Sequence, residues 1–249
     1  MKYPRTLSWS PNLFLTLGII GYIAVFFMLT CWKYTHFYYD NLDLAIFNNV
    51  FFNSLQGNWF AATIHPPTYL GDHFSPLILL LLPFYALGRN PITLLAMQTI
   101  IIGCTALPIY QIAKKILGAE KQWHALGIAL LWLLNPVVHN MNFFEFSLVP
   151  FAMFFVFLAI YFYQQKQTWA FTAALVMALL AREDISLIVF FFGFIAWFEK
   201  RNWFWRLTPM VLAIASAAIG FSVIGAFSAT GSYKFLTYYG WLGGTTVPE

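Results

Sequence analysis

The chain has 249 residues, of which 61% are hydrophobic, 20% are aromatic and only 9% are charged. Soluble domains carry about 25% charged residues, so this composition excludes an ordinary soluble enzyme and indicates a protein with several membrane spans. The expected fold class is all-α and polytopic, because a segment that crosses lipid must satisfy its own backbone hydrogen bonds.

The first apolar run, residues 12–31, is long enough to cross a bilayer and lacks a following small-residue cleavage site, so it is expected to be a retained span. A long polar and aromatic external loop, residues 32–76, comes next. Apolar residues at helical spacing within 44–55 predict a short interfacial helix in this loop. Asp40 is its expected N-cap, and Gly57 is expected to end it.

Ser75 and Pro76 predict the start of another helix, over residues 77–87. About eleven residues rise only about 16 Å, short of the roughly 30 Å hydrocarbon core, so this helix is expected to be re-entrant or half-buried. Longer runs are expected to form about seven spans in one multi-pass domain, residues 1–249. These runs are 12–31, 91–112, 123–138, 148–163, 169–181, 185–198 and 207–227.

The charges divide between the two sides that this topology defines. Nine basic residues share the side of the N-terminus: Lys2, Arg5, Lys114, Lys115, Lys121, Lys166, Lys200, Arg201 and Arg206. Only four lie opposite: Lys33, Arg89, Arg182 and Lys234. The positive-inside rule then predicts a cytoplasmic N-terminus. Most acidic residues fall on the outer side. The net charge of +4 is therefore the sum of a basic inner side and an acidic outer side, and it gives no argument for a nucleic-acid partner.

Three groups of ionisable residues are expected to meet on the outer side: Asp40 with the Asp72-His73 pair, then Glu145, then the Arg182-Glu183-Asp184 triplet. Charges at the edge of the hydrocarbon layer usually face a cavity or a partner. Neighbours on a helix point about 100° apart, so the triplet is not expected to neutralise itself. Structural roles remain open: helix caps, a fixed turn, a solvated loop tip at Glu145 and an inter-helix ion pair.

The order of several motifs resembles the bacterial and archaeal membrane proteins grouped as domain of unknown function 2079. These motifs are Tyr39-Asp40, 70–76 with Gly-Asp-His-Phe-Ser-Pro, 91–98, Phe144-Glu145-Phe146 and Arg182-Glu183-Asp184. This chain departs from the family pattern at two places. The family has Asp followed by His-Pro where this chain has Glu145 and Ser147-Leu148, and it has Lys where this chain has Arg182. The resemblance implies a prokaryotic plasma (inner) membrane protein. Relatives have more spans, so this chain is expected to be a shortened version.

That family is similar in layout to the GT-C type of polyprenyl-phosphate-dependent glycosyltransferases, which carry a catalytic acid on a long first external loop. The similarity implies transfer of a sugar from a lipid-phosphate donor at the outer face. In that function Asp40 is the expected base, Arg182 would bind the phosphate, and His73 would bond nearby.

The remaining acidic residues are expected to bind substrate: Asp72, Glu145, Glu183 and Asp184. Asp40, Asp72, Glu183 and Asp184 are also candidate ligands for Mg²⁺ or Mn²⁺, since these ions prefer oxygen ligands. Two other classes remain open. One is a transporter or flippase of a lipid-linked or ionic substrate, and the other is a non-catalytic assembly subunit. Transporters usually place ionisable groups near mid-span, where this sequence has almost none.

Overall fold

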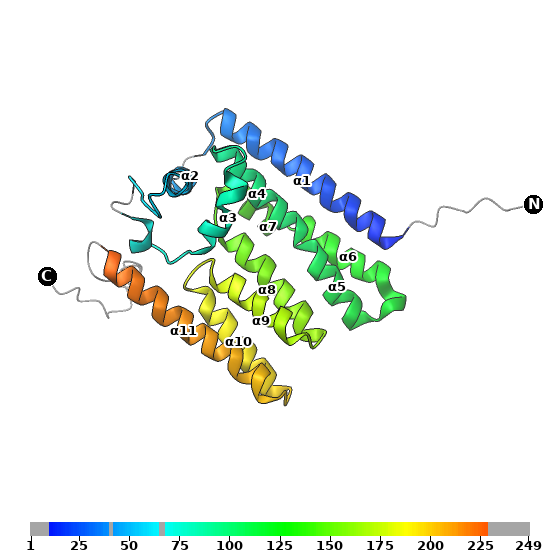
Figure 1. Ribbon diagram of the computed structural model, residues 1–249. Helices are drawn as coiled ribbons and strands as arrows, with labels where there is room; N and C mark the ends of the chain where they lie inside the picture. Colours follow the sequence, from blue (N-terminus) through cyan, green and yellow to red (C-terminus); the bar gives the residue numbers. More distant parts are fainter. Residues whose placement is uncertain (1–9, 40–41, 65–67, 229–249) are drawn as a thin grey trace, which may run out of the picture.

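A computed structural model describes residues 10–39, 42–64 and 68–228 (Figure 1). In these ranges the chain is helical, and the only β-type pairing is an isolated bridge between Ala61 and Thr68. The all-α prediction is therefore confirmed. The elements are α1 (Pro11–Thr35), α2 (Asp43–Leu55), η1 (Tyr69–Gly71), α3 (Leu77–Tyr85), α4 (Pro91–Cys104), α5 (Ala106–Leu117), η2 (Ala119–Lys121), α6 (Gln122–Leu133), α7 (Pro136–Phe144), α8 (Val149–Gln164), α9 (Thr168–Leu179), α10 (Ile185–Phe198) and α11 (Trp203–Phe227).

The helices form a bundle with two chemically different ends. The turns after α5, α8 and α10 gather at one end, here called the basic end, which carries Lys114, Lys115, Lys121, Lys166, Lys200, Arg201 and Arg206 (Figure 1). The other end, here called the acidic end, holds α2, the start of α3, the turn before α10 and the end of α11. It carries Asp43, Asp72, Glu145, Glu183 and Asp184. The segregation of charge expected from the sequence is thus present in the fold.

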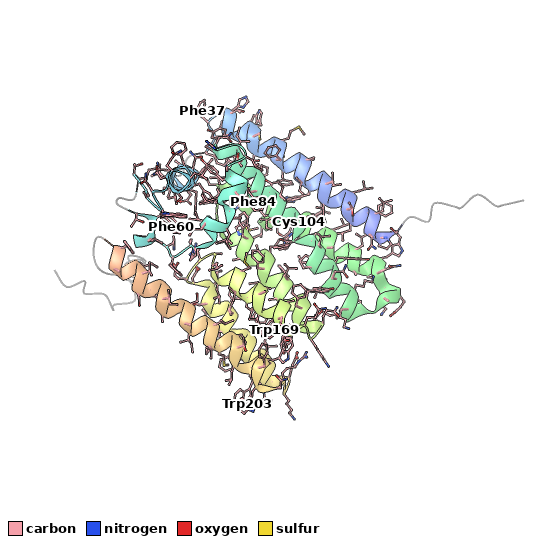
Figure 2. The ribbon with its side chains drawn as sticks, viewed as in Figure 1. Phe37, Phe60, Phe84, Cys104, Trp169 and Trp203 are labelled. Atoms are coloured by element: carbon pink, nitrogen blue, oxygen red, sulfur yellow. The ribbon has the colours of Figure 1, made fainter. Side chains whose placement is uncertain are left out.

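Bulky aromatic residues mark both ends (Figure 2). Trp169 and Trp203 lie at the basic end, whereas Phe37 and Phe60 lie at the acidic end. Trp169, Trp203 and Phe37 are exposed. Exposed aromatic rings at the two ends of an apolar bundle are typical of anchors at the two membrane–water interfaces.

Three helical stretches are long and apolar enough to cross a membrane: Pro11–Thr35, Pro91–Leu117 and Trp203–Phe227. The paired helices α6 and α7 pass the same test together but are bent by 40°. Pro136 causes this break, because proline lacks the backbone N–H and crowds the preceding turn. The expected span 123–138 is therefore broken near its end, and its crossing of the membrane stays a prediction. The apolar helices α8, α9 and α10 have only 16, 12 and 14 residues, so a total of seven spans stays a prediction.

The two short helices expected within residues 44–55 and 77–87 are present. In Figure 1, α2 is seen nearly end-on while α1 and α11 lie along the picture plane, so α2 crosses the direction of the bundle. It ends before Gly57, whose φ of 88° suits glycine after a helix. Its start differs from the prediction: α2 begins at Asp43 after Leu42, so Asp40 is not its N-cap. Helix α3 has only nine residues, which confirms a short helix after the 71–76 motif.

Candidate functional site at the acidic end

The centre of the site is a bond between two segments that lie 110 residues apart in the sequence. His73 Nδ1 donates to Glu183 Oε1 at 2.8 Å. The backbone N–H of Phe74 donates to the other carboxylate oxygen, Glu183 Oε2, at 3.1 Å. The Glu183 carboxylate therefore holds both the side chain and the backbone of the 71–76 motif.

Glu183 is fully buried, and its surroundings favour the charged form. Burial alone would raise the pKa of its carboxyl, but the bonds from His73 and from the Phe74 N–H outweigh burial and lower the pKa below its ordinary value. Helix α11 lies directly against this group. A Cβ added at Gly220 would come within 2.9 Å of the Glu183 Cβ, so a side chain at that position would displace the glutamate.

Residues at both ends of the 71–76 motif also contact neighbouring elements. A Cβ at Gly71 would lie 2.5 Å from the Phe227 carbonyl oxygen, so only glycine allows this approach to the end of α11. After the motif, the Leu77 N–H donates to the Leu180 carbonyl at 2.8 Å. The motif thus joins three elements: the start of α3, the turn between α9 and α10, and the end of α11.

Arg182 and Asp184 pair with each other on the exposed side of the same turn. Arg182 Nε donates to Asp184 Oδ1 at 3.1 Å, and Nη2 donates to Oδ2 at 2.7 Å. The expectation that the triplet could not neutralise itself was therefore wrong for this pair. It assumed helical geometry, whereas residues 182–184 form a turn that brings positions two apart together. For Glu183 the expectation was right, since its partner His73 comes from another segment.

Asp72 and Tyr69 belong to the same cluster. Asp72 is nearly buried and Tyr69 is buried. Burial and the neighbouring Asp72 carboxylate raise the pKa of the Tyr69 phenol, whereas the positive charge of Arg182 lowers it. One buried phenol thus responds to charges from both sequence segments. The structure therefore brings Asp72, His73, Arg182, Glu183 and Asp184 to one place, while Asp40 lies outside the described residues.

Glu145 has a different position from the solvated loop tip that the sequence left open. Its side chain is only 1% exposed, and Oε2 accepts from the Leu44 N–H at 2.5 Å, in the first turn of α2. The Gln98 side chain fixes the loop, because its Nε2 donates to the Glu145 carbonyl at 2.6 Å and its Oε1 accepts from the Ser147 N–H at 2.7 Å. Glu145 thus supplies the negative charge that a helix start favours.

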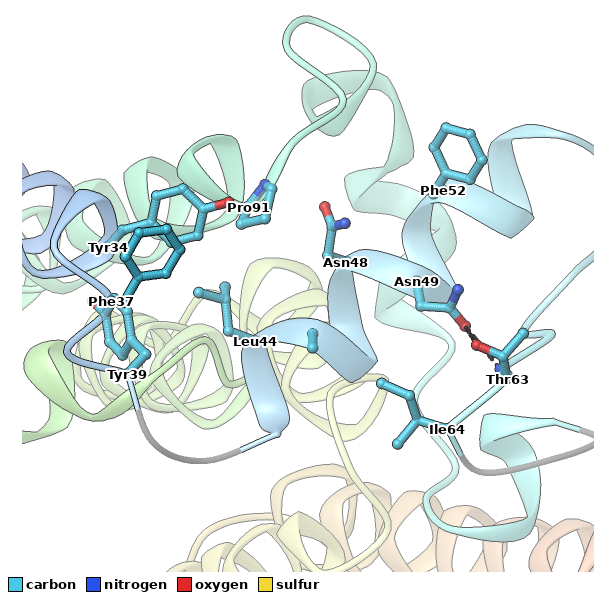
Figure 3. A pocket seen from close by; sticks show the side chains of 11 residues that line it. Tyr34, Phe37, Tyr39, Leu44, Asn48, Asn49, Phe52, Thr63, Ile64 and Pro91 are labelled. Atoms are coloured by element: carbon cyan, nitrogen blue, oxygen red, sulfur yellow. Dashed lines mark hydrogen bonds between the residues drawn. The ribbon is translucent and has the colours of Figure 1, made fainter.

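A cavity of about 500 Å³ lies beside this helix, lined by the end of α1, one side of α2, Thr63, Ile64 and Pro91 (Figure 3). Its wall includes Tyr39, which directly precedes Asp40 in the sequence. Burial and the Glu145 carboxylate raise the pKa of the Tyr39 phenol. No local sequence pattern indicates the cavity, because its walls come from four separate segments. Its lining includes two amide side chains, Asn48 and Asn49, which carry no charge.

The described residues contain no group of three or more His, Cys, Asp and Glu side chains arranged to hold a metal ion. Asp72, Glu183 and Asp184 do share one cluster, but Glu183 is bonded to His73 and Asp184 to Arg182. The role of Asp40 as a base or metal ligand stays a prediction, because this residue lies outside the described ranges.

These features define a helical membrane protein with a cluster of ionisable residues at one end of its bundle. The chain belongs to the family described as Predicted membrane protein (DUF2079), whose model matches residues 33–248. That range contains the 71–76 motif, Glu145 and the Arg182-Glu183-Asp184 triplet. Comparisons with curated proteins and with solved structures gave no match.

Proposed function

We propose that this protein is a membrane glycosyltransferase that moves a sugar from a polyprenyl-phosphate donor to an acceptor at the outer face. The observation that supports it best is the meeting of the 71–76 motif and the Arg182-Glu183-Asp184 turn in one cluster at the acidic end. A lipid-linked donor carries its phosphate at the membrane surface. Its chemistry therefore requires a cation and a proton acceptor at that depth.

The positions of the charges fit a reaction at the rim of the membrane. In the described residues, every Asp, Glu, Lys and Arg lies in a loop or in the first or last turn of a helix. A transport path would place such groups near the middle of the spans. This distribution favours surface chemistry over passage through the bundle.

Arg182 is the proposed phosphate-binding residue. Its side chain is 29% exposed and already makes a two-point contact with the Asp184 carboxylate. The planar guanidinium binds phosphate oxygens in the same two-point manner. A donor phosphate would therefore exchange with Asp184 or share the guanidinium with it, and the positive charge would stabilise the phosphate as it leaves.

Two residues are proposed to receive the proton of the acceptor hydroxyl. Asp40 is the first candidate for this base, because it belongs to the expected first external loop. His73 is the alternative, because its bond from Nδ1 to Glu183 holds an imidazole, a common catalytic base, within the cluster. In the step, the base takes the hydroxyl proton, the acceptor oxygen bonds to the anomeric carbon, and the bond from that carbon to the phosphate oxygen breaks. The products are the glycoside and polyprenyl phosphate.

The test is a transfer assay with the purified chain in nanodiscs and polyprenyl-phosphate sugars labelled in the sugar. Asp40→Asn, His73→Gln and Arg182→Gln are compared with Glu120→Gln, an exposed carboxylate at the basic end. Loss of a general base typically costs about 100-fold or more. Full turnover in both Asp40→Asn and His73→Gln would remove both residues from the mechanism, and full turnover in Arg182→Gln would remove the phosphate role.

A further inference from the structure

The cavity beside α2 presents hydrogen-bond donors whose direction is fixed by the protein. Asn48 Oδ1 accepts from the Tyr85 hydroxyl at 2.7 Å. Asn49 Oδ1 accepts from the Thr63 N–H at 2.9 Å and from the Thr63 hydroxyl at 3.2 Å. Each amide oxygen is thus occupied inside the protein. The Thr63 N–H orients the Asn49 amide, because a backbone N–H can only meet the oxygen end, and the Tyr85 hydroxyl bonds to the oxygen end of Asn48.

The NH₂ groups of the two asparagines are the ends left for a ligand. Both side chains line the cavity and are half-buried (Figure 3). An NH₂ group offers two donors and no acceptor, so it suits the oxygen atoms of hydroxyl, ether or carbonyl groups. Because their oxygens are already bonded, these side chains can bind a ligand without a rearrangement of the site.

Aromatic rings form much of the remaining wall. Tyr34 and Phe37 line the side formed by the end of α1, and Phe52 lies further along α2 (Figure 3). Phe37 is 92% exposed, and its φ of 59° lies in the left-handed region that a bulky residue rarely adopts. The Phe37 N–H donates to the Tyr34 carbonyl and the Tyr38 N–H donates to the Lys33 carbonyl, so this conformation ends α1 and holds the ring beside the cavity.

The cavity has the chemistry for a neutral sugar ring. Its lining combines aromatic faces, which pack against the C–H groups of a sugar, with amide donors for hydroxyl oxygens. Among the residues that the structure describes, none that lines the cavity is charged, which favours a neutral ligand over a phosphate or a carboxylate. Arg182, the proposed phosphate-binding residue, belongs to the separate cluster around Glu183.

We infer that this cavity is a sugar subsite, in which the Asn48 and Asn49 amides bind ring hydroxyls and Phe37 covers the ring. The inference rests on the proposed function only for the view that this sugar is part of the substrate. Binding of a free sugar does not require transfer, so the two ideas can be tested separately.

The variants Asn48→Asp and Asn49→Asp isolate the proposed donors. Aspartate keeps an oxygen for Tyr85 or Thr63 and replaces the NH₂ group by a second acceptor, so the internal hydrogen bonds survive. Asn58→Asp is the matched control, since it makes the same change of charge on an exposed residue outside the cavity lining.

The measurement is saturation-transfer NMR on the full chain in nanodiscs with free glucose, galactose, mannose and arabinose as probes. We expect at least one sugar to bind, with affinity reduced about tenfold or more in Asn48→Asp and Asn49→Asp and unchanged in Asn58→Asp. No binding of any sugar, or equal binding by all variants, would overturn the subsite. Sugar binding that depends on the asparagines, without any transfer from a lipid donor, would uphold the subsite and refute the proposed function.

Discussion

Removal of the Glu183 carboxylate should lower the free energy of unfolding more than removal of an exposed carboxylate, because Glu183 joins the 71–76 motif to the turn before α10. Glu183→Ala leaves the His73 Nδ1–H and the Phe74 N–H without their acceptor in a buried place. Hydrogen bonds to a charged group contribute about 1.5–3 kcal/mol each, so the loss is expected to be about 3–6 kcal/mol. Glu183→Gln keeps the shape and one acceptor oxygen, and should lose roughly half as much.

The effect should depend on pH in one direction. A carboxyl whose pKa is lower in the folded chain binds fewer protons when folded, so its contribution is present above its ordinary pKa. That contribution disappears as the pH falls through the lower, folded pKa. The difference in unfolding free energy between wild type and Glu183→Gln should therefore be full above about pH 5 and shrink below the ordinary value of 4.5.

Unfolding can be followed with a thiol-reactive fluorophore, because Cys31 and Cys104 are free and partly buried. Asp184→Asn is the control, since it changes an exposed carboxylate in the same turn. Equal stability of wild type and Glu183→Ala would refute the role of this carboxylate as the anchor of the motif. A difference between wild type and Glu183→Gln that grows on acidification would refute the direction assigned to its pKa.

Three further predictions concern the same end of the bundle. Gly71→Ala should lower the free energy of unfolding by about 1–3 kcal/mol, because the new Cβ meets a backbone carbonyl of α11, whereas Gly21→Ala meets nothing within 4 Å and should be neutral or stabilising. Glu145→Ala should cost about 1–3 kcal/mol by leaving the buried Leu44 N–H without its acceptor, and equal protection of that amide in hydrogen exchange would contradict this. Phe37→Asn should raise stability by about 1 kcal/mol, because asparagine tolerates the left-handed region, yet weaken sugar binding in the NMR assay; unchanged binding would contradict the role of the ring.

The sequence was sufficient for features that depend on local patterns. The apolar runs predicted the helices because a span must be uniformly apolar, and Ser75-Pro76 predicted a short helix after the motif. The separation of basic and acidic residues predicted the two unlike ends. The convergence of the Asp72-His73 pair with Glu183 followed from the cost of burying a charge without a partner.

Other features depended on tertiary geometry that no local pattern contains. Glu145 was open to interpretation as a loop tip because nothing near it in the sequence shows that it reaches Leu44 at the start of α2. The pairing of Arg182 with Asp184 was not expected, because helical geometry was assumed for the side-chain directions of residues that form a turn. The Asn48 and Asn49 amides were not recognised because their orientation depends on Tyr85 and Thr63, which lie further along the chain.

The most direct test of the proposed transfer reaction uses proteoliposomes that contain the chain and a radiolabelled polyprenyl-phosphate sugar. Two products are measured in the same sample: label joined to an acceptor by a new glycosidic bond, and labelled donor that has moved to the other leaflet. We expect a glycosidic product that is lost in Arg182→Gln, with no movement of donor across the bilayer. Movement of the intact donor without a new glycosidic bond would contradict the account and identify a flippase instead.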